Sequence, residues 1–203
     1  LIVSQKESPM TQVTIGRSDA GDVTLDVQRL IVSRLLVTAS SGGGKSWLLR
    51  KILEEVSATT QTIVIDPEGE FASLRELRDM VLVGPEGDLP ADPRSAGLLA
   101  RRLMEKNVSA VIDIYELPPT KRREFVANFC QSLIDLPKAL WRPCFVAIDE
   151  THEFAPEGDH FASSEAVALL SSKGRKRGFC PLFATQRLSK LSKDVAAEAK
   201  VRF

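Results

Sequence analysis

A glycine-rich turn between an apolar run and an amphipathic segment constrains the fold of this chain most. Residues Arg34–Ala39 read RLLVTA, the turn from Ser40 to Ser46 reads SSGGGKS, and apolar residues then recur at helical spacing as far as Val56. An apolar run closed by glycines predicts a strand and a tight turn, and the spacing that follows predicts a helix. Strand, glycine-rich turn, Lys-Ser and helix form the order of a phosphate-binding loop.

The residue types of this turn suit a triphosphate. Glycines let backbone N–H groups converge on phosphate oxygens, and a helix N-terminus favours an anion. Lys45 can reach the outer phosphates and the Ser46 hydroxyl can bind Mg²⁺. We therefore expect ATP and Mg²⁺ as ligands. The expected nucleotide-binding residues are Ser41, Gly42, Gly43, Gly44, Lys45, Ser46 and Trp47.

Two features of the turn leave alternatives open. Ala39 stands where the pattern usually begins with glycine, and a flexible Gly-Ser turn before a helix is the simpler reading of the same residues. Trp47 could stack on a base or pack in the core or at a subunit interface, and its amphipathic character favours packing.

Polar residues follow two further apolar runs. Cys144–Ile148 leads into Asp149-Glu150, where Asp149 is predicted to bind Mg²⁺ and Glu150 to act as the general base. Solvated carboxylates at a strand end are the alternative. Cys180–Thr185 leads into Gln186, which could orient water or sense the nucleotide.

Other charged segments have two interpretations each. The carboxylates of Asp66–Glu70 could lie near the metal or cap a helix that begins near Phe71. The basic run Lys173-Gly174-Arg175-Lys176-Arg177 predicts either a solvated helix end or an arginine finger. Arg175 and Arg177 are the candidates for a finger that reaches a neighbouring subunit.

Apolar runs alternate with amphipathic segments, which predicts an α/β fold with a mostly parallel sheet in a single domain over residues 1–203. The predicted strands are Gln12–Ile15, Val23–Val27, Arg34–Ala39, Gln61–Asp66, Met80–Val83, Ala110–Tyr115, Pro143–Asp149 and Cys180–Thr185. The predicted helices are Lys45–Val56, Asp92–Lys106, Thr120–Ile134 and Ser163–Arg177, with a last one starting at Ser192.

Composition excludes a few classes. No apolar run approaches the roughly 18 residues of a membrane span, and no signal peptide opens the chain. The isolated Cys130, Cys144 and Cys180 predict buried, reduced thiols and hence a cytoplasmic protein. The chain starts at Leu1 and ends at Phe203 without a terminating signal, which suggests a fragment.

Taken together, the motifs resemble the HerA branch of the HerA/FtsK superfamily. The segments that carry the resemblance are Ser40–Ser46, Val64–Phe71, Ile148–Glu150 with His152–Phe154, and Gly174–Gly178 followed by Ala184–Arg187. The resemblance implies a RecA-like, ATP-driven DNA translocase that forms a homo-hexamer. It would assign Lys45 and Ser46 to the Walker A pair, Asp149 to the metal-linked carboxylate and Glu150 to the catalytic base. Gln186 would be the polar sensor, and Arg175–Arg177 would hold the finger supplied in trans.

The resemblance also implies partners. Relatives act beside a NurA-type nuclease, and others in anti-phage defence act with sirtuin-like or other effector enzymes. Against the family's full-length pattern, we expect the residues ahead of Thr11 to be too few for the N-terminal β-barrel of many relatives, and the strands usual after the position of Phe203 to be missing.

Two rival functions remain open. A small-molecule kinase would need a lid, for which the loops Leu117–Thr120 and Ala155–His160 are candidates. A nucleotide-dependent assembly module would organise an effector ring with little translocation. The basic runs Lys121–Arg123 and Arg101-Arg102 could contact DNA, although both also suit an ordinary helix surface.

Overall fold

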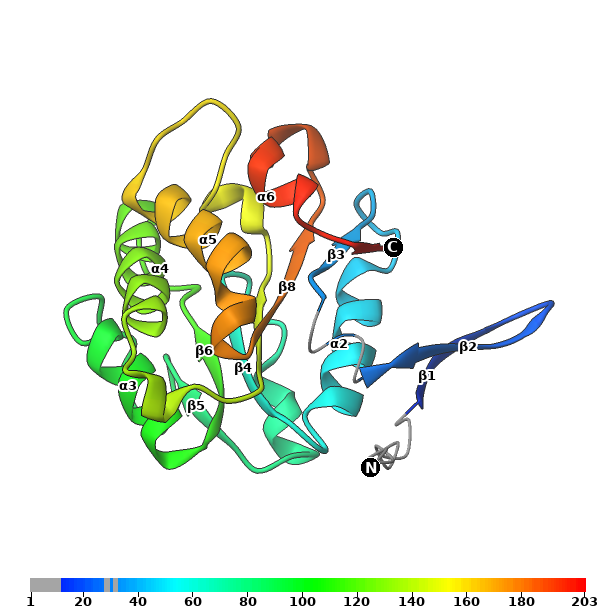
Figure 1. The fold of residues 1–203 in the computed structure, drawn as a ribbon, viewed down its shortest axis with the longest axis horizontal. Helices are drawn as coiled ribbons and strands as arrows, with labels where there is room; N and C mark the ends of the chain where they lie inside the picture. The colour runs from blue at the N-terminus through cyan, green and yellow to red at the C-terminus, as the bar shows by residue number, and fades with distance from the viewer. Residues whose placement is uncertain (1–11, 28–29, 31–32) are drawn as a thin grey trace, which may run out of the picture.

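Seven parallel strands form the central sheet of the computed structural model, which describes residues 12–27, 30 and 33–203 (Figure 1). Their order is β5-β6-β4-β7-β8-β3-β9, and every pairing between neighbours is parallel. The strands are β3 (Leu35–Thr38), β4 (Gln61–Asp66), β5 (Met80–Val83), β6 (Ser109–Asp113), β7 (Cys144–Ile148), β8 (Phe179–Thr185) and β9 (Val201–Arg202). The predicted α/β class with a mostly parallel sheet is confirmed.

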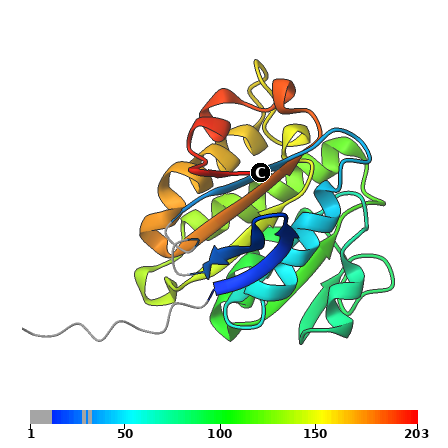
Figure 2. The same cartoon turned by 90° about the vertical axis from the view of Figure 1, so that its right-hand side faces the viewer.

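Helices cover both faces of this sheet. The helix α2 (Lys45–Val56) lies on one face, where it contacts an antiparallel hairpin of β1 (Gln12–Ser18) and β2 (Gly21–Asp26) that projects from the body (Figures 1 and 2). The opposite face carries α3 (Ala96–Lys106), α4 (Pro119–Ile134), α5 (Ala162–Lys173) and the short α6 (Lys193–Ala197). The 3-10 segments are η1 (Ala72–Glu76), η2 (Lys138–Leu140), η3 (Thr151–Glu153), η4 (Gly174–Arg177) and η5 (Leu188–Lys190).

The alternation of side chains along each strand divides the core into two. In β3, Leu36 packs with the helices α3, α4 and α5, whereas Leu35 and Val37 pack with α2 and the hairpin. Every residue of β4, β7 and β8 is buried, as expected of parallel strands covered on both sides. The three cysteines are free and buried, in agreement with the predicted core thiols.

The predicted elements hold with changes at their ends. The predicted bounds of α2, Lys45 and Val56, are those of the structure. The helix α3 begins at Ala96 and not at Asp92, because Asp92 accepts the N–H of Arg94 and forms a turn instead. The predicted helix to Arg177 ends at Lys173 and continues only as η4.

The predicted last helix is wrong in its second half. It is limited to α6, and Val201–Arg202 form β9 beside β3. Residues 1–11, which we expect to be too few for an N-terminal β-barrel, lie outside the described residues. None of the helices in the described ranges has the length and apolarity of a membrane-spanning segment.

Candidate active site at the strand ends

Glycines give the loop between β3 and α2 its path. Gly42 and Gly44 have φ values of +74° and +83°, a region that side chains with a Cβ rarely adopt. Gly43 donates its N–H to Ser40 O at 2.8 Å, and a Cβ on Gly43 would lie only 2.9 Å from the same oxygen. The turn therefore depends on glycine at three consecutive positions.

The N-terminus of α2 is open to an anion. Its N-cap residue, Gly44, makes no side-chain capping bond, and the first turn contains no acidic residue. The first N–H groups of a helix have no partner within the helix, and they carry the positive end of its dipole. The start of α2 thus presents N–H donors beside the glycine loop, as binding of a phosphate requires.

Lys45 joins this loop to the acidic pair. Its ammonium contacts Asp149 Oδ1 and lies 2.9 Å from Glu150 Oε1, and all three side chains are buried. Burial disfavours the charged ammonium, but the charges of Asp149 and Glu150 outweigh it and raise the pKa of Lys45. Lys45 is therefore held as a cation next to two carboxylates.

The backbone turns sharply to place the second of these carboxylates. Glu150 has a φ of +43°, an uncommon value for a residue with a side chain. The turn is fixed by Glu150 N, which donates to Asp149 Oδ1 at 2.8 Å, and by Glu153 N, which donates to Glu150 O at 2.8 Å. Such local strain is common where a side chain must be aimed at a site.

His152 contacts Glu150 from the other side. Its Nδ1 lies 3.1 Å from Glu150 Oε2 and 2.9 Å from Thr185 Oγ1, and Gln186 N donates to Glu150 Oε2 at 3.3 Å. Burial raises the pKa of Glu150, but these bonds from His152 and the contacts with Lys45 prevail and lower it to about 2. Glu150 is therefore ionised and held at both oxygens.

The sequence did not predict this contact of His152 with Glu150. His152 lies two residues beyond Glu150, and the intervening left-handed turn brings its ring back to the carboxylate. The only signal for this contact in the sequence is a His shortly after an Asp-Glu pair, and this signal does not indicate where the His side chain points.

The residues present fit Mg²⁺ bound together with phosphates. Asp149 Oδ2 is buried and has no hydrogen-bond partner among the described residues, so one lone-pair face of this carboxylate is free. Ser46, at the start of α2, is half-buried. Across the described ranges, no group of three or more His, Cys, Asp or Glu side chains is arranged to hold a metal by itself. Mg²⁺ in phosphate sites usually takes only one or two protein ligands.

Two of the three carboxylates at the end of β4 and just beyond it, Asp66 and Glu68, differ in their surroundings. Asp66 accepts the N–H groups of Glu68, Gly69 and Phe71, so it ties down the following loop. Burial raises the pKa of Asp66 to about 6 in spite of these bonds. Glu68 is exposed, and its pKa is raised by partial burial and by the nearby charges of Glu153, Glu150 and Asp149. Asp66 agrees with the capping interpretation, since it accepts the N–H of Phe71 just before the 3-10 helix η1, which begins at Ala72.

The sheet order places Gln186 between the loop and the acids. The strand β8 lies between β7 and β3, with Thr185 paired to Thr38 at the start of the loop. Gln186 follows at the same edge, exposed and bonded through its backbone to Glu150.

The two candidate arginines lie at the opposite end of the strands, where the parallel strands of the sheet begin. η4 precedes β8, whose seven residues extend about 20 Å from Arg177 to the site at the usual rise per residue. Arg177 donates to Ile134 O at 2.7 Å and lies over the ring of Trp141. Arg175 is exposed, and neither arginine can reach Lys45 of its own chain.

The basic runs suggested for DNA are paired within the chain. Arg101 and Arg102 both pair with Glu105, and Lys121 pairs with Glu124. Arg122 donates to the carbonyls of Leu117 and Tyr115 after β6. These contacts favour the interpretation of an ordinary helix surface.

Comparison with known proteins now decides the family. The family model described as the central domain of helicase HerA matches residues 13–138, which is more than half of the chain. The chain belongs to the HerA central-domain family. A relative, the DNA double-strand break repair helicase HerA of Pyrococcus furiosus, is 25% identical over 133 residues, which cover 66% of this chain and 22% of the relative. The chain thus spans about a fifth of the length of that helicase.

Solved structures agree with the HerA family in fold. VirB4 of Thermoanaerobacter pseudethanolicus has a TM-score of 0.62 at 14% identity, covering 96% of this chain and 82% of VirB4. The genome packaging NTPase B204 of Sulfolobus turreted icosahedral virus 2, in complex with ATP-gammaS, has a TM-score of 0.56 at 13% identity, covering 85% and 74%. At these identities the likeness establishes the P-loop ATPase fold alone.

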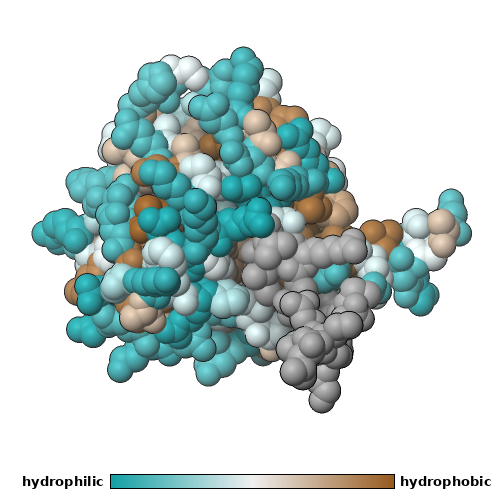
Figure 3. Space-filling model, in the orientation of Figure 1, coloured by the Kyte–Doolittle hydropathy of each residue, from teal (hydrophilic) through white to brown (hydrophobic). Residues whose placement is uncertain are grey.

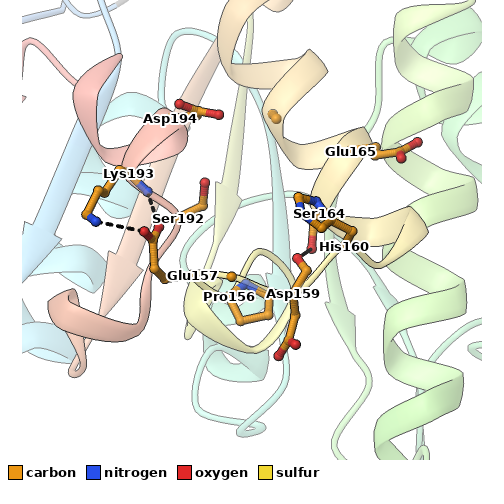
Figure 4. A pocket seen from close by; sticks show the side chains of 11 residues that line it. Pro156, Glu157, Asp159, His160, Ser164, Glu165, Ser192, Lys193 and Asp194 are labelled. Atoms are coloured by element: carbon orange, nitrogen blue, oxygen red, sulfur yellow. Dashed lines mark hydrogen bonds and ion pairs between the residues drawn. The ribbon is translucent and has the colours of Figure 1, made fainter.

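A separate hollow of about 460 Å³ lies outside this HerA-type site (Figure 4). It is bounded by the loop after Ala155, by α5 and by α6, and Glu157 there pairs with Lys193 at 2.9 Å. None of its lining residues comes from the phosphate loop or the Asp149-Glu150 pair. Its walls carry Glu165 and Asp194 as well, which does not favour an anionic phosphate.

Proposed function

We propose that this chain is the ATP-hydrolysing domain of a HerA-type ring ATPase, formed as one RecA-like domain over residues 1–203. The observation that carries the proposal is the meeting of Lys45, from the glycine loop, with Asp149 and Glu150, from the end of β7. A loop with unpaired N–H donors, a cation and two aligned carboxylates is the set of groups that triphosphate hydrolysis needs.

Lys45 would exchange its carboxylate partners for phosphate oxygens as a triphosphate binds. The backbone N–H groups of Gly42, Gly44 and Lys45 would bind phosphate oxygens, and Ser46 and Asp149 would hold Mg²⁺. The metal ion supplies charge neutralisation of the phosphates when bound. Nucleotide complexes of the structurally similar B204 support a nucleotide at this loop.

Glu150 would then act as general base. Release of Lys45 to the phosphates would remove one of the contacts that lower the pKa of Glu150 and would leave Oε1 free to accept a proton from water. His152 and Gln186 N hold the other oxygen, so the carboxylate keeps its direction through this exchange. The Gln186 side chain, exposed at the same edge, would position the attacking water.

Catalysis would be completed between subunits. Because η4 lies at the far edge of the sheet, an arginine from it can serve only the site of a neighbour. A homo-hexameric ring is the arrangement that the resemblance implies, and DNA translocation with a nuclease or sirtuin-like effector is the activity that we assign to it. The DNA repair helicase HerA of Pyrococcus furiosus supports DNA as the substrate of the ring.

The experiment is ATP binding and turnover by the purified chain. Lys45→Ala should weaken ATP binding roughly tenfold to a hundredfold, because a charge-assisted contact is lost. Glu150→Gln should bind ATP but should hydrolyse it at least about a hundredfold more slowly than the wild type. Lys193→Ala removes a surface lysine that pairs with Glu157 and should behave as wild type. Wild-type turnover in Glu150→Gln would refute the assignment of the base.

Two further measurements separate the rival functions. Native mass with and without ATP tests for the ring, and ATPase activity with and without duplex DNA tests for translocation. A ring whose ATPase ignores DNA would favour the assembly module. Transfer of phosphate to a small acceptor would favour the kinase.

A further inference from the structure

Among the residues that the structure describes, Trp47 is the most exposed large hydrophobic residue. Its side chain is 74% exposed, although it is the residue next to Ser46 in the first turn of α2. The sequence favoured packing in the core or an interface, and core packing is wrong. An indole exposed to this degree leaves most of its apolar area in water, and Trp is enriched where proteins contact ligands and partners.

Trp47 borders a hollow of about 530 Å³ between α2 and β1. One wall is the strand residues from Gln12 to Arg17, and the other is a stripe of α2 formed by Trp47, Lys51 and Glu55. Successive members of the stripe are four residues apart and so share one helix face. Lys51 and Glu55 neutralise each other in an ion pair of 2.5 Å, which leaves Trp47 as the aromatic surface of this wall. Hydrophobic side chains reach the surface where the hairpin leaves the body (Figure 3).

The direction of a bound triphosphate would place its inner phosphate, which carries the nucleoside, near Trp47. The outer phosphate must lie toward Lys45, Asp149 and Glu150, which meet on the β7 and β8 side of the loop. The strand β1 faces Trp47 across this hollow, whereas the acids follow β7, which β8 separates from β3. The N–H groups of the first helical turn bind the inner phosphates, so the group attached to them leaves the loop beside the first-turn side chains.

We propose that Trp47 and the facing strand β1 form the nucleobase subsite of the triphosphate site. The indole would stack on the base, and the backbone and polar side chains of β1 would close the opposite wall. Stacking uses the face that every base has, so the subsite would accept purines with little discrimination. This inference rests on the proposed function, because it assumes that a triphosphate binds at the glycine loop.

The test compares ATP with inorganic triphosphate, which has no base. Trp47→Ala should raise the Kd for ATP about tenfold and leave the Kd for inorganic triphosphate unchanged, whereas Trp47→Phe should retain most of the ATP affinity. Leu98→Ala, at another exposed apolar residue on a helix, is the matched control and should change neither. In Trp141→Phe, which leaves Trp47 as the sole tryptophan, ATP should change the fluorescence and inorganic triphosphate should not.

The outcomes separate this inference from the proposed function. Equal weakening of both ligands in Trp47→Ala would mean that the side chain supports the loop, and no weakening of either would place it at a protein interface; each result overturns the subsite. If the wild-type chain binds neither ligand, the proposed function fails and the subsite fails with it. Binding of both ligands that is lost in Lys45→Ala but insensitive to Trp47 refutes the subsite alone.

Discussion

Lys45 Nζ lies 2.9 Å from Glu150 Oε1, and the same ammonium contacts Asp149 Oδ1. The cation that we assign to the phosphates is thus also the counter-ion of both carboxylates. A buried carboxylate without a partner is costly, so this pairing couples the stability of the fold to the groups of the site. Binding of a triphosphate would have to compete for the lysine.

The first prediction concerns stability at acid pH. The pKa of Glu150 is lowered from 4.5 to about 2, so its contribution is present above pH 4.5 and is lost as the pH falls toward 2. The contribution amounts to roughly 3 kcal/mol at most. Chemical denaturation of the wild type and of Glu150→Gln between pH 6 and pH 2 should give a difference in unfolding free energy that shrinks in this window.

The comparison removes the titration of carboxylates whose pKa does not depend on Glu150, such as Asp66. Asp66, with its pKa raised to about 6, loses stabilisation in the opposite direction, as the pH rises from 3.8 through 6. It titrates in both proteins and cancels in their difference. A difference that stays constant from pH 6 to pH 2 would contradict the ionised, bonded state of Glu150.

The second prediction isolates the loop backbone. Gly44 and Gly158 share a φ of +83°, and an added Cβ would meet nothing within 4 Å at either residue. Alanine at each position should therefore cost about 1 kcal/mol of unfolding free energy through backbone strain alone. Only Gly44→Ala should also weaken ATP binding, because it shifts the N–H groups at the start of α2.

Gly158→Ala serves as the matched control for that strain. Thermal or chemical denaturation measures the shared cost, and calorimetry measures the ATP affinity of each variant. If both variants lost affinity equally, the effect would be one of general stability and the loop would have no special part in binding.

The third prediction concerns His152 as a positioning residue. Its Nδ1–H can donate to Glu150 Oε2, and His152→Ala removes this bond without removing the carboxylate. Turnover should fall roughly tenfold or more with little change in KM, since a misdirected base affects the reaction more than binding. His152→Asn keeps a donor at nearly the same position and should recover most of the activity.

The split between kcat and KM distinguishes this role from a structural one. A loss of stability in His152→Ala with unchanged turnover per folded molecule would mean that the ring only packs. Equal losses in the alanine and asparagine variants would show that the donor is not what matters.

Local pattern was sufficient for much of the fold. The bounds of α2 and β4 were predicted because glycines and charged residues punctuate a strong periodicity. The strand β9 was missed because Val201–Arg202 is too short to have a pattern of its own and is extended only through its pairing with β3. Helix propensity at the end of the chain is overridden by this tertiary contact.

Residues of the candidate site could be singled out from the sequence where they lie in consecutive runs. The loop, Lys45 and the Asp149-Glu150 pair lie in such runs, and the structure brings them together as expected. The hydrogen bond between His152 and Glu150 depends on a left-handed turn at Glu150, which periodicity does not reveal. The exposure of Trp47 depends on the hairpin beside it, which lies far from any motif.

The final prediction separates Arg175 from Arg177, which look equivalent in the sequence. Arg177 donates to Ile134 O and to Lys173 O and lies 5.1 Å from the centre of the Trp141 ring. Arg177→Ala should therefore lower the unfolding free energy by roughly 1–3 kcal/mol. Arg175 is exposed, and Arg175→Ala should stay within about 0.5 kcal/mol of the wild type.

This difference makes Arg175 the better candidate for the finger supplied in trans. Arg175→Ala should leave ATP binding intact and reduce turnover of the assembled ring, by about 10³-fold if the arginine acts as fingers do elsewhere. Mixing Arg175→Ala with Glu150→Ala subunits should restore part of the activity, because an intact base in one subunit then meets an intact arginine of its neighbour. If Arg175→Ala alone keeps full turnover, or if mixed rings stay as inactive as each variant alone, Arg175 does not supply the finger in trans.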